Sequence, residues 1–219
     1  MKYLPLLLTL AISPAFAVIA DDSDSEDQPL VVNGCVIKPE SQCPNANLEG
    51  ADLNNQDMRK MNLAGANLKN ANLRHANLDL ANLEKAQLQG AVLSRASLQQ
   101  ANLRIADLTG ANLVAAQAWG MFAQGAKFND ANLSAAYLEF AKLSGAKLHN
   151  SNLQAADLEM TWLSRADLLG ANLADANLQE AKFGESNLEN ADLRGTRKHY
   201  ANFQDANMEG CQGCPKTWD

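Results

Sequence analysis

Proline is absent from the long middle of this chain of 219 residues, between positions 46 and 210. All six prolines lie nearer the ends: Pro5, Pro14, Pro29, Pro39, Pro44 and Pro215. Proline has no backbone N–H and is therefore poorly tolerated where each N–H must bond to neighbouring backbone. The gap between Pro44 and Pro215 indicates a long segment whose backbone is hydrogen-bonded throughout.

The middle segment also lacks the leucine spacing of a helix or a strand, because its leucines recur every five residues, as at Leu68, Leu73 and Leu78. In a helix, five residues turn the chain by about 500°, so successive leucines would spiral around the cylinder. In a strand, side chains alternate with period two, so every second leucine would face the wrong side. The leucines share one side only if the chain turns a corner in each repeat, which predicts an all-β solenoid.

The repeat keeps its register for thirty-three frames, from Ala46 to Gly210. The first inward position is Ala in twenty-six frames and the central one is Leu in twenty-five, while Asn, Asp and Gly crowd the outward positions. The resulting pattern A-[ND]-L-x-x resembles the pentapeptide-repeat family. The resemblance implies a right-handed quadrilateral β-helix with four repeats per turn, hence about eight coils and a rod roughly 40 Å long at the spacing of β-strands.

Cysteine is scarce, and its four residues flank the solenoid as two close pairs. Cross-pairing would have to span the rod, whereas a disulfide joins Cα atoms no more than about 7 Å apart. We therefore predict disulfides Cys35–Cys43 and Cys211–Cys214, in an N-terminal cap at 31–45 and a C-terminal cap at 211–219. Such caps would cover the open backbone edges of the solenoid. A redox motif at Cys-Gln-Gly-Cys is the alternative, but it lacks a βαβ setting.

Residues 1–17, MKYLPLLLTLAISPAFA, have the pattern of a secretory signal peptide, with an A-x-A site at its end. We expect export, to a bacterial periplasm in the first instance, with secretion or a thylakoid lumen as alternatives and no stable membrane insertion after cleavage. An uncleaved anchor is the competing interpretation. Residues 18–30 form an acidic linker that we expect to be disordered, and its last ten residues hold five acids and no base. We interpret it as a spacer, with an interaction tail as the alternative.

The solenoid lacks a strong charge of either sign, since residues 46–210 hold eighteen acids and fifteen bases. Scattered bases without a basic stripe predict no nucleic acid as partner. Some members of the family are thought to imitate DNA and occupy DNA gyrase. Inhibition or protection of a DNA topoisomerase is therefore an alternative function, disfavoured here by the export signal and by the near balance of charge.

Aromatic residues number only twelve, yet five of them fall at outward positions between residues 119 and 162. If residues i and i+20 stack, these aromatics gather with one methionine into a candidate interaction patch for an unidentified protein or a second copy: Trp119, Phe122, Tyr137, Phe140, Met160 and Trp162. Ala118 and Ala123 replace central leucines nearby. The alternative is therefore that Trp119, Met121 or Phe122 turns inward to fill the gap.

Catalytic residues find little support in the sequence. The three histidines, His75, His149 and His199, are predicted on different faces, which leaves no visible nucleophile–base pair. Glu139 and Glu159 would stack on a convex wall, which favours a solvated acidic spot over a catalytic dyad or a weak calcium site. We predict a non-catalytic exported scaffold, not an enzyme, with no metal and no cofactor. Lys198 in a central position predicts a bulge at 195–200 that turns its amine to solvent.

Overall fold

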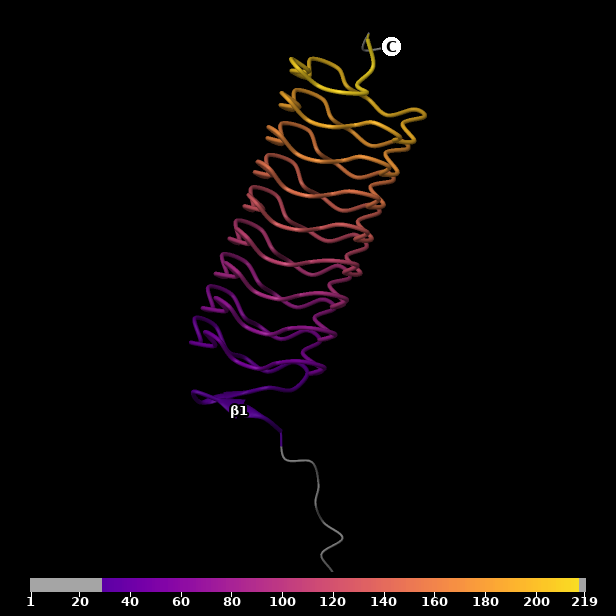
Figure 1. Cartoon of the computed structure of the whole chain (residues 1–219). Helices are drawn as coiled ribbons and strands as arrows, with labels where there is room; N and C mark the ends of the chain where they lie inside the picture. The colour runs from indigo at the N-terminus through magenta and orange to yellow at the C-terminus, as the bar shows by residue number, and fades with distance from the viewer. Residues whose placement is uncertain (1–28, 217–219) are drawn as a thin grey trace, which may run out of the picture.

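The structure, a computed structural model, describes residues 29–216 of the chain. The predicted signal peptide at 1–17 and most of the acidic linker lie outside the described residues. Figure 1 shows a rod of stacked coils, with β1 at one end and the C-terminus at the other. Among the described residues, no helix is long and apolar enough to cross a membrane.

The rod has four sides because each residue in the second position of a repeat pairs with the residue twenty positions later. The pairing is parallel and runs from Gln42–Asn62 to Asp192–Gln212 without a break in register. We name the four columns of paired residues by their ends: face A (Asn47 to Asn207), face B (Asp52 to Gln212), face C (Asp57 to Arg197) and face D (Gln42 to Asn202). Four five-residue sides make one square coil.

Backbone hydrogen bonds join each coil to the coils above and below. The N–H of Leu68 donates to the carbonyl of Gln87 at 2.7 Å, and the N–H of Asn67 donates to the carbonyl of Ala46 at 2.9 Å. The same two bonds recur along the rod. A proline at either position would remove one of them, which explains its absence from the repeats.

The asparagine of the repeat has a structural role at each side. The Oδ1 atom of Asn67 accepts the N–H of Lys69 at 3.3 Å, and its Nδ2 atom donates to Oδ1 of Asn47 in the coil below at 3.1 Å. The side chain thus caps a backbone N–H at the corner and adds a rung to a ladder of amides. An Asn or Asp in this position stabilises both the corner and the stack.

The fifth residue of each repeat turns the corner in the left-handed region of φ. Glycine and asparagine adopt this region at little cost, as at Gly65 with φ of 67° and Asn70 with φ of 55°. Bulky apolar residues also occupy it, among them Phe140 with φ of 59° and Met160 with φ of 54°. Such residues are disfavoured there, so their presence calls for another reason than folding.

The inward alanines and leucines fill the axis of the rod and are fully buried along most of its length. Ala118 and Ala123 stand in central positions that leucine usually holds, so this coil lacks two leucine-sized side chains. Met121, in a position usually held by alanine, and Phe128, in one usually held by leucine, are both buried with no exposed surface. They restore the lost volume, so the core is filled without Trp119 or Phe122.

The N-terminal cap contains the two named strands, β1 (Val31–Val32) and β2 (Cys35–Val36), paired antiparallel. The predicted disulfides Cys35–Cys43 and Cys211–Cys214 are both present. Cys43 lies in the first coil, since Gln42 already pairs with Asn62. The first disulfide therefore ties the cap to the solenoid itself.

The predicted bulge at 195–200 is wrong, because Asn177 pairs with Arg197 in the regular register. Lys198 stays in its frame with its side chain half-buried, and its Nζ atom donates to the carbonyl of Gly213 at 2.9 Å. Lys198 lies in the last paired repeat of face C, so no further coil covers it among the described residues. The C-terminal cap therefore supplies the acceptor that a buried amine would lack inside the rod.

Candidate interaction surface

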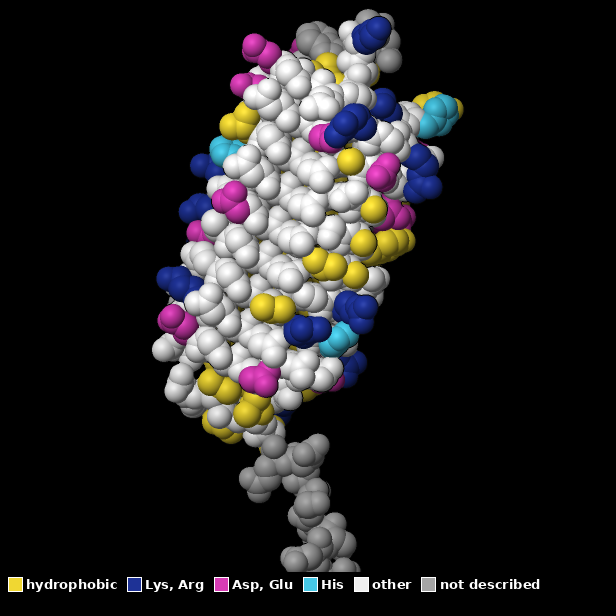
Figure 2. All heavy atoms as spheres, in the orientation of Figure 1, with side chains coloured by type: hydrophobic (Ala, Val, Ile, Leu, Met, Phe, Trp, Pro, Cys, Tyr) yellow, Lys and Arg dark blue, Asp and Glu magenta, His cyan; other side chains and the backbone are white. Residues whose placement is uncertain are grey.

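Four of the six predicted patch residues have well-exposed side chains. Trp119 and Tyr137 are each 36 % exposed, Phe140 is 40 % exposed and Trp162 is 45 % exposed. Phe122 is half-buried but points away from the core, and Met160 is also half-buried. Figure 2 shows hydrophobic side chains gathered near one edge of the visible face, about midway along the rod.

Trp119 and Phe140 form the apolar part of the corner between faces C and D. Their rings meet edge to face with centroids 5.8 Å apart, a favourable geometry for aromatic pairs. Gly120 lies between Gln100 and Phe140 in the same corner column and has no side chain to fill the space. A shallow hollow of about 270 Å³ results, lined by Gln100, Trp119, Gly120, Phe122, Phe140 and Lys142.

Phe122 and Trp162 lie on face D, with Lys142 between them in the column. The Lys142 ammonium is 4.9 Å from the centre of the Phe122 ring and 5.6 Å from that of Trp162. Two further cations flank the rings: Arg104, from the fourth position of the repeat one coil below, is 5.0 Å from Phe122, and Lys182, the next residue of the column, is 4.5 Å from Trp162. We call these five residues, Arg104, Phe122, Lys142, Trp162 and Lys182, the cation–π ladder.

The cations of the ladder hold no carboxylate within 4 Å among the described residues. The ring faces of Phe122 and Trp162 are instead approached by these cations from neighbouring coils. The outer surface of the ladder is therefore electropositive.

Face D also leaves a row of backbone N–H groups without a side-chain cap. Asn102 caps the N–H of Arg104 at 3.2 Å, and Asn202 caps that of Gln204 at 2.8 Å. Between them the column reads Phe122, Lys142, Trp162 and Lys182, none of which can accept a hydrogen bond through its side chain as asparagine does. The described structure gives no acceptor for the N–H groups two residues on, at Gln124, Ser144, Ser164 and Gly184.

Tyr137 lies on face C, on the other side of the corner from the ladder. Its hydroxyl donates to Oε2 of Glu139 at 2.5 Å. This hydrogen bond, with partial burial and the charges of Glu139, Asp157 and Glu159, raises the pKa of Tyr137 to about 12. The corner therefore separates an acidic patch on face C from the electropositive ladder on face D.

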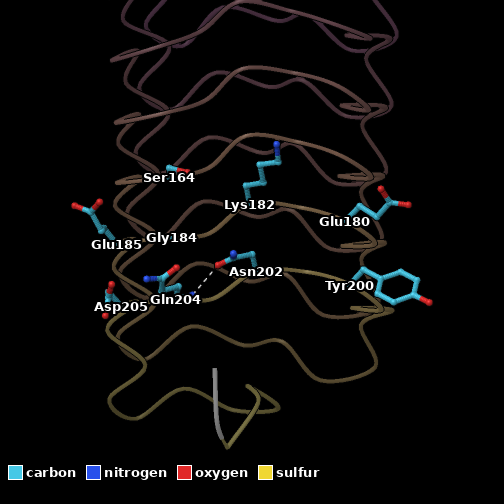
Figure 3. Close-up of a pocket in the computed structure, with 9 residues that line it drawn as sticks. All are labelled: Ser164, Glu180, Lys182, Gly184, Glu185, Tyr200, Asn202, Gln204 and Asp205. Atoms are coloured by element: carbon cyan, nitrogen blue, oxygen red, sulfur yellow. Dashed lines mark hydrogen bonds between the residues drawn. The ribbon is translucent and has the colours of Figure 1, made fainter. Parts of the chain in front are cut away.

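A second hollow, of about 640 Å³, lies at the C-terminal end of face D (Figure 3). Lys182 and Asn202 occupy its middle, Glu185 and Asp205 one side, and Glu180 and Tyr200 the other. Glu185 is engaged by Arg165 through two 3.0 Å hydrogen bonds, which hold the pKa of that carboxyl below its usual value. The hollow continues the ladder through Lys182, and its lining is mainly polar.

Glu139 and Glu159, the two acids considered for catalysis, lie one coil apart on face C, beside the paired residues Tyr137 and Asp157. Glu139 is bonded to Tyr137, and Glu159 accepts from Nδ2 of Asn177 at 3.0 Å. His149 pairs with Asp167 on face A. Burial raises the pKa of Asp167, but hydrogen bonds from His149 and Asn187 outweigh it and leave the pKa below its usual value. Residues 29–216 hold no cluster of three or more potential metal ligands from His, Cys, Asp and Glu.

The family of the chain follows from its repeats. The profile described as "Pentapeptide repeats" matches in eight copies over residues 46–84, 86–118, 131–170 and 171–211, which is most of the chain. The protein belongs to the pentapeptide-repeat family. The predicted right-handed quadrilateral β-helix of about eight coils, with a disulfide near each end, is confirmed. A comparison with curated proteins finds no match.

Solved structures of the same family resemble this pentapeptide-repeat protein. HetL from the cyanobacterium Nostoc sp. strain PCC 7120, a protein involved in heterocyst differentiation regulation, is 30% identical, with 80% of this chain and 88% of HetL covered and a TM-score of 0.49. QnrB1, a plasmid-mediated fluoroquinolone resistance protein, is 16% identical, with 80% and 90% covered and a TM-score of 0.43. A pentapeptide repeat protein of the Arabidopsis thaliana thylakoid lumen is 27% identical, with 56% and 65% covered and a TM-score of 0.21.

The sequence prediction placed the aromatic residues but missed the cations between them. Lys142 and Lys182 share the face D column with Phe122 and Trp162, which the twenty-residue period already implies. The available signal was a run of four second positions without Asn or Asp, at 122, 142, 162 and 182. Each such position both frees a backbone N–H and places a new side chain outward.

Proposed function

We propose that this pentapeptide-repeat protein is an exported, non-catalytic scaffold that holds another protein against its aromatic patch. The single supporting observation is the exposure of four aromatic side chains, Trp119, Tyr137, Phe140 and Trp162, in one region of the rod. Aromatic side chains grouped on a surface are typical of protein interfaces, where they supply much of the binding energy.

Backbone geometry at the corner adds support for this function. Phe140 and Met160 both occupy left-handed positions that glycine or asparagine fills at lower cost, with φ of 59° and 54°. The inward positions that begin their own repeats are held by ordinary buried alanines, Ala136 and Ala156. The bulky corner residues therefore serve the outer surface and not the core.

Partner capture from the native envelope tests the proposal. We expect the full chain to retain a protein partner and the double variant Trp119→Ser, Phe140→Ser to lose at least tenfold of it, since two buried aromatic contacts cost more than about 1.4 kcal/mol. The matched control is Leu80→Ser, Ile105→Ser, because these apolar side chains are 50 % and 58 % exposed but lie outside the patch. Equal capture by all three chains would rule the patch out.

Export is part of the same proposal and has its own test. The N-terminal sequence of the protein isolated from its host is expected to begin after Ala17, at the end of the A-x-A site. An intact N-terminus in the cytoplasm would reopen the alternative function, action on a DNA topoisomerase. The eighteen acids and fifteen bases of residues 46–210 give that alternative little support.

A further inference from the structure

Face D offers hydrogen-bond donors and positive charge in a line parallel to the rod axis. Four consecutive coils leave uncapped N–H groups at Gln124, Ser144, Ser164 and Gly184. Among the described residues, no other face has a run of four such groups; the run on face C is two, at Trp119 and Glu139. Beside this row stand the three cations of the ladder, none of which has a carboxylate partner within 4 Å among residues 29–216. A strip of donors and cations suits a linear series of carboxylates.

The cations of the ladder are regularly spaced. Arg104 and Lys142 lie on opposite sides of Phe122, and Lys142 and Lys182 lie on opposite sides of Trp162. Along the rod axis each pair is therefore separated by two coils, or about 9.6 Å at the usual strand spacing, with Arg104 set to one side of the column because it is the fourth residue of its repeat. A complementary ligand would present negative charges at the same interval.

The acidic segment of this chain has that interval. Asp21, Asp24 and Asp27 are each three residues apart. In a polyproline II conformation three residues make one turn and advance about 9.3 Å, so the three carboxylates would lie along one edge at nearly the spacing of the cations. Residues 21–30 contain no lysine or arginine that would oppose binding to the ladder.

The segment cannot reach the whole ladder of its own rod. Pro29, where the described residues begin, precedes the first coil, and Lys182 lies seven coils beyond Gln42 in the face D column. Seven coils span about 34 Å, whereas the eight residues 21–28 extend at most about 29 Å. A segment from another molecule is not restricted in this way.

We propose that the acidic segment Asp21–Asp27 of one molecule binds along face D of a second copy, with its carboxylates on Arg104, Lys142 and Lys182. Its remaining oxygens accept from the uncapped N–H groups of the same strip. This inference names an occupant for face D. It rests on the proposed scaffold function in that Phe122 and Trp162 belong both to the aromatic patch and to the cation–π ladder. The contact is electrostatic and lies at the surface, so it weakens as salt is added.

Mixing two complementary variants of the full chain tests this contact. The tail variant is Asp21→Asn, Asp24→Asn, Asp27→Asn, and the face variant is Lys142→Gln, Lys182→Gln. Sedimentation at low ionic strength should show association of the unchanged protein and at least tenfold weaker association of each variant alone. An equal mixture of the two should associate again, because one supplies an intact face and the other an intact segment.

The control variant Lys69→Gln, Lys147→Gln changes charge equally on face A, and we expect it to associate like the unchanged protein. Phe140→Ser should also leave association unchanged, since Phe140 lies outside the ladder; failure of the scaffold function can therefore be told apart from failure of this inference. The proposal is overturned if the unchanged chain stays monomeric, if the mixture does not recover, or if the control loses association to the same degree. Binding of an acidic polysaccharide such as polygalacturonate by a monomeric chain would also overturn it.

Discussion

Faces B and D run through the same coils but differ in one column of residues. On face B the second positions are Asn112, Asn132, Asn152 and Asn172, each of which caps a backbone N–H. The last three also form an amide ladder. On face D the corresponding residues are Phe122, Lys142, Trp162 and Lys182. Both faces keep regular pairing, so the fold does not require asparagine at every coil.

This difference separates folding from surface function along a single repeat. The inward positions and the stacked backbone give the rod its shape, as the buried Leu133 on face B and Leu143 on face D illustrate. Asparagine in the second position adds stability, but another residue can take its place where the outer surface has a different role. Face B is thus a reference for measuring how the residues of face D change the stability and the association of the protein.

The largest expected effect tests whether the core is packed equally well behind faces B and D. Leu133→Ala and Leu143→Ala should each lower the free energy of unfolding by about 3 kcal/mol, because both side chains are fully buried and would leave a cavity. Urea unfolding followed by far-ultraviolet circular dichroism measures both. A loss below about 1 kcal/mol on face D alone would mean that its core is looser than that of face B.

A smaller loss is expected when face B is given a residue typical of face D. Asn152 accepts the N–H of Gln154 at 3.1 Å and the Nδ2 of Asn172 at 3.2 Å, and donates to Asn132 at 3.4 Å. Asn152→Lys removes these partly exposed bonds and should cost about 1–2 kcal/mol in unfolding free energy. Asn152→Asp, which keeps the acceptor, should cost less; equal losses would mean that the cap contributes little.

The reverse change on face D should stabilise the protein. Lys182→Asn would cap the N–H of Gly184 and accept from Asn202, while it removes one cation–π contact with Trp162 at 4.5 Å. The two new hydrogen bonds outweigh an exposed cation–π contact, so we expect a gain of about 0.5–1 kcal/mol in the free energy of unfolding. Self-association should weaken in the same variant. A loss of stability would show that the ladder serves the fold itself.

The fold could be predicted from the sequence because the same pattern of inward and outward residues recurs in each repeat. Ala and Leu at fixed inward positions, with Asn in the second position, leave one arrangement that buries the central leucines. Lys198 misled the prediction because its acceptor, the carbonyl of Gly213, belongs to a cap outside the repeats. The pattern within the repeats does not predict the contacts between the last repeats and the cap.

The outer surface was only partly predictable. The column period placed Phe122 and Trp162 together, but whether Trp119 and Phe122 faced out depended on how the gap at Ala118 and Ala123 was filled. Met121 and Phe128 fill it from different sides of the coil. This is a matter of packing volume in three dimensions, which the repeat pattern leaves open.

The smallest expected effect concerns the acidic side of the corner, which has no equivalent on face B. The pKa of Tyr137 is raised from its usual 10.0 to about 12, chiefly by its hydrogen bond to Glu139. Because the folded value is the higher one, the bond stabilises the fold fully below pH 10, and its contribution is lost as the pH rises through about 12. An absorbance titration at the phenolate band, compared with Tyr137→Phe, isolates this step. Glu139→Gln should move the midpoint back toward 10, whereas an unmoved midpoint would assign the shift to Asp157, Glu159 and burial.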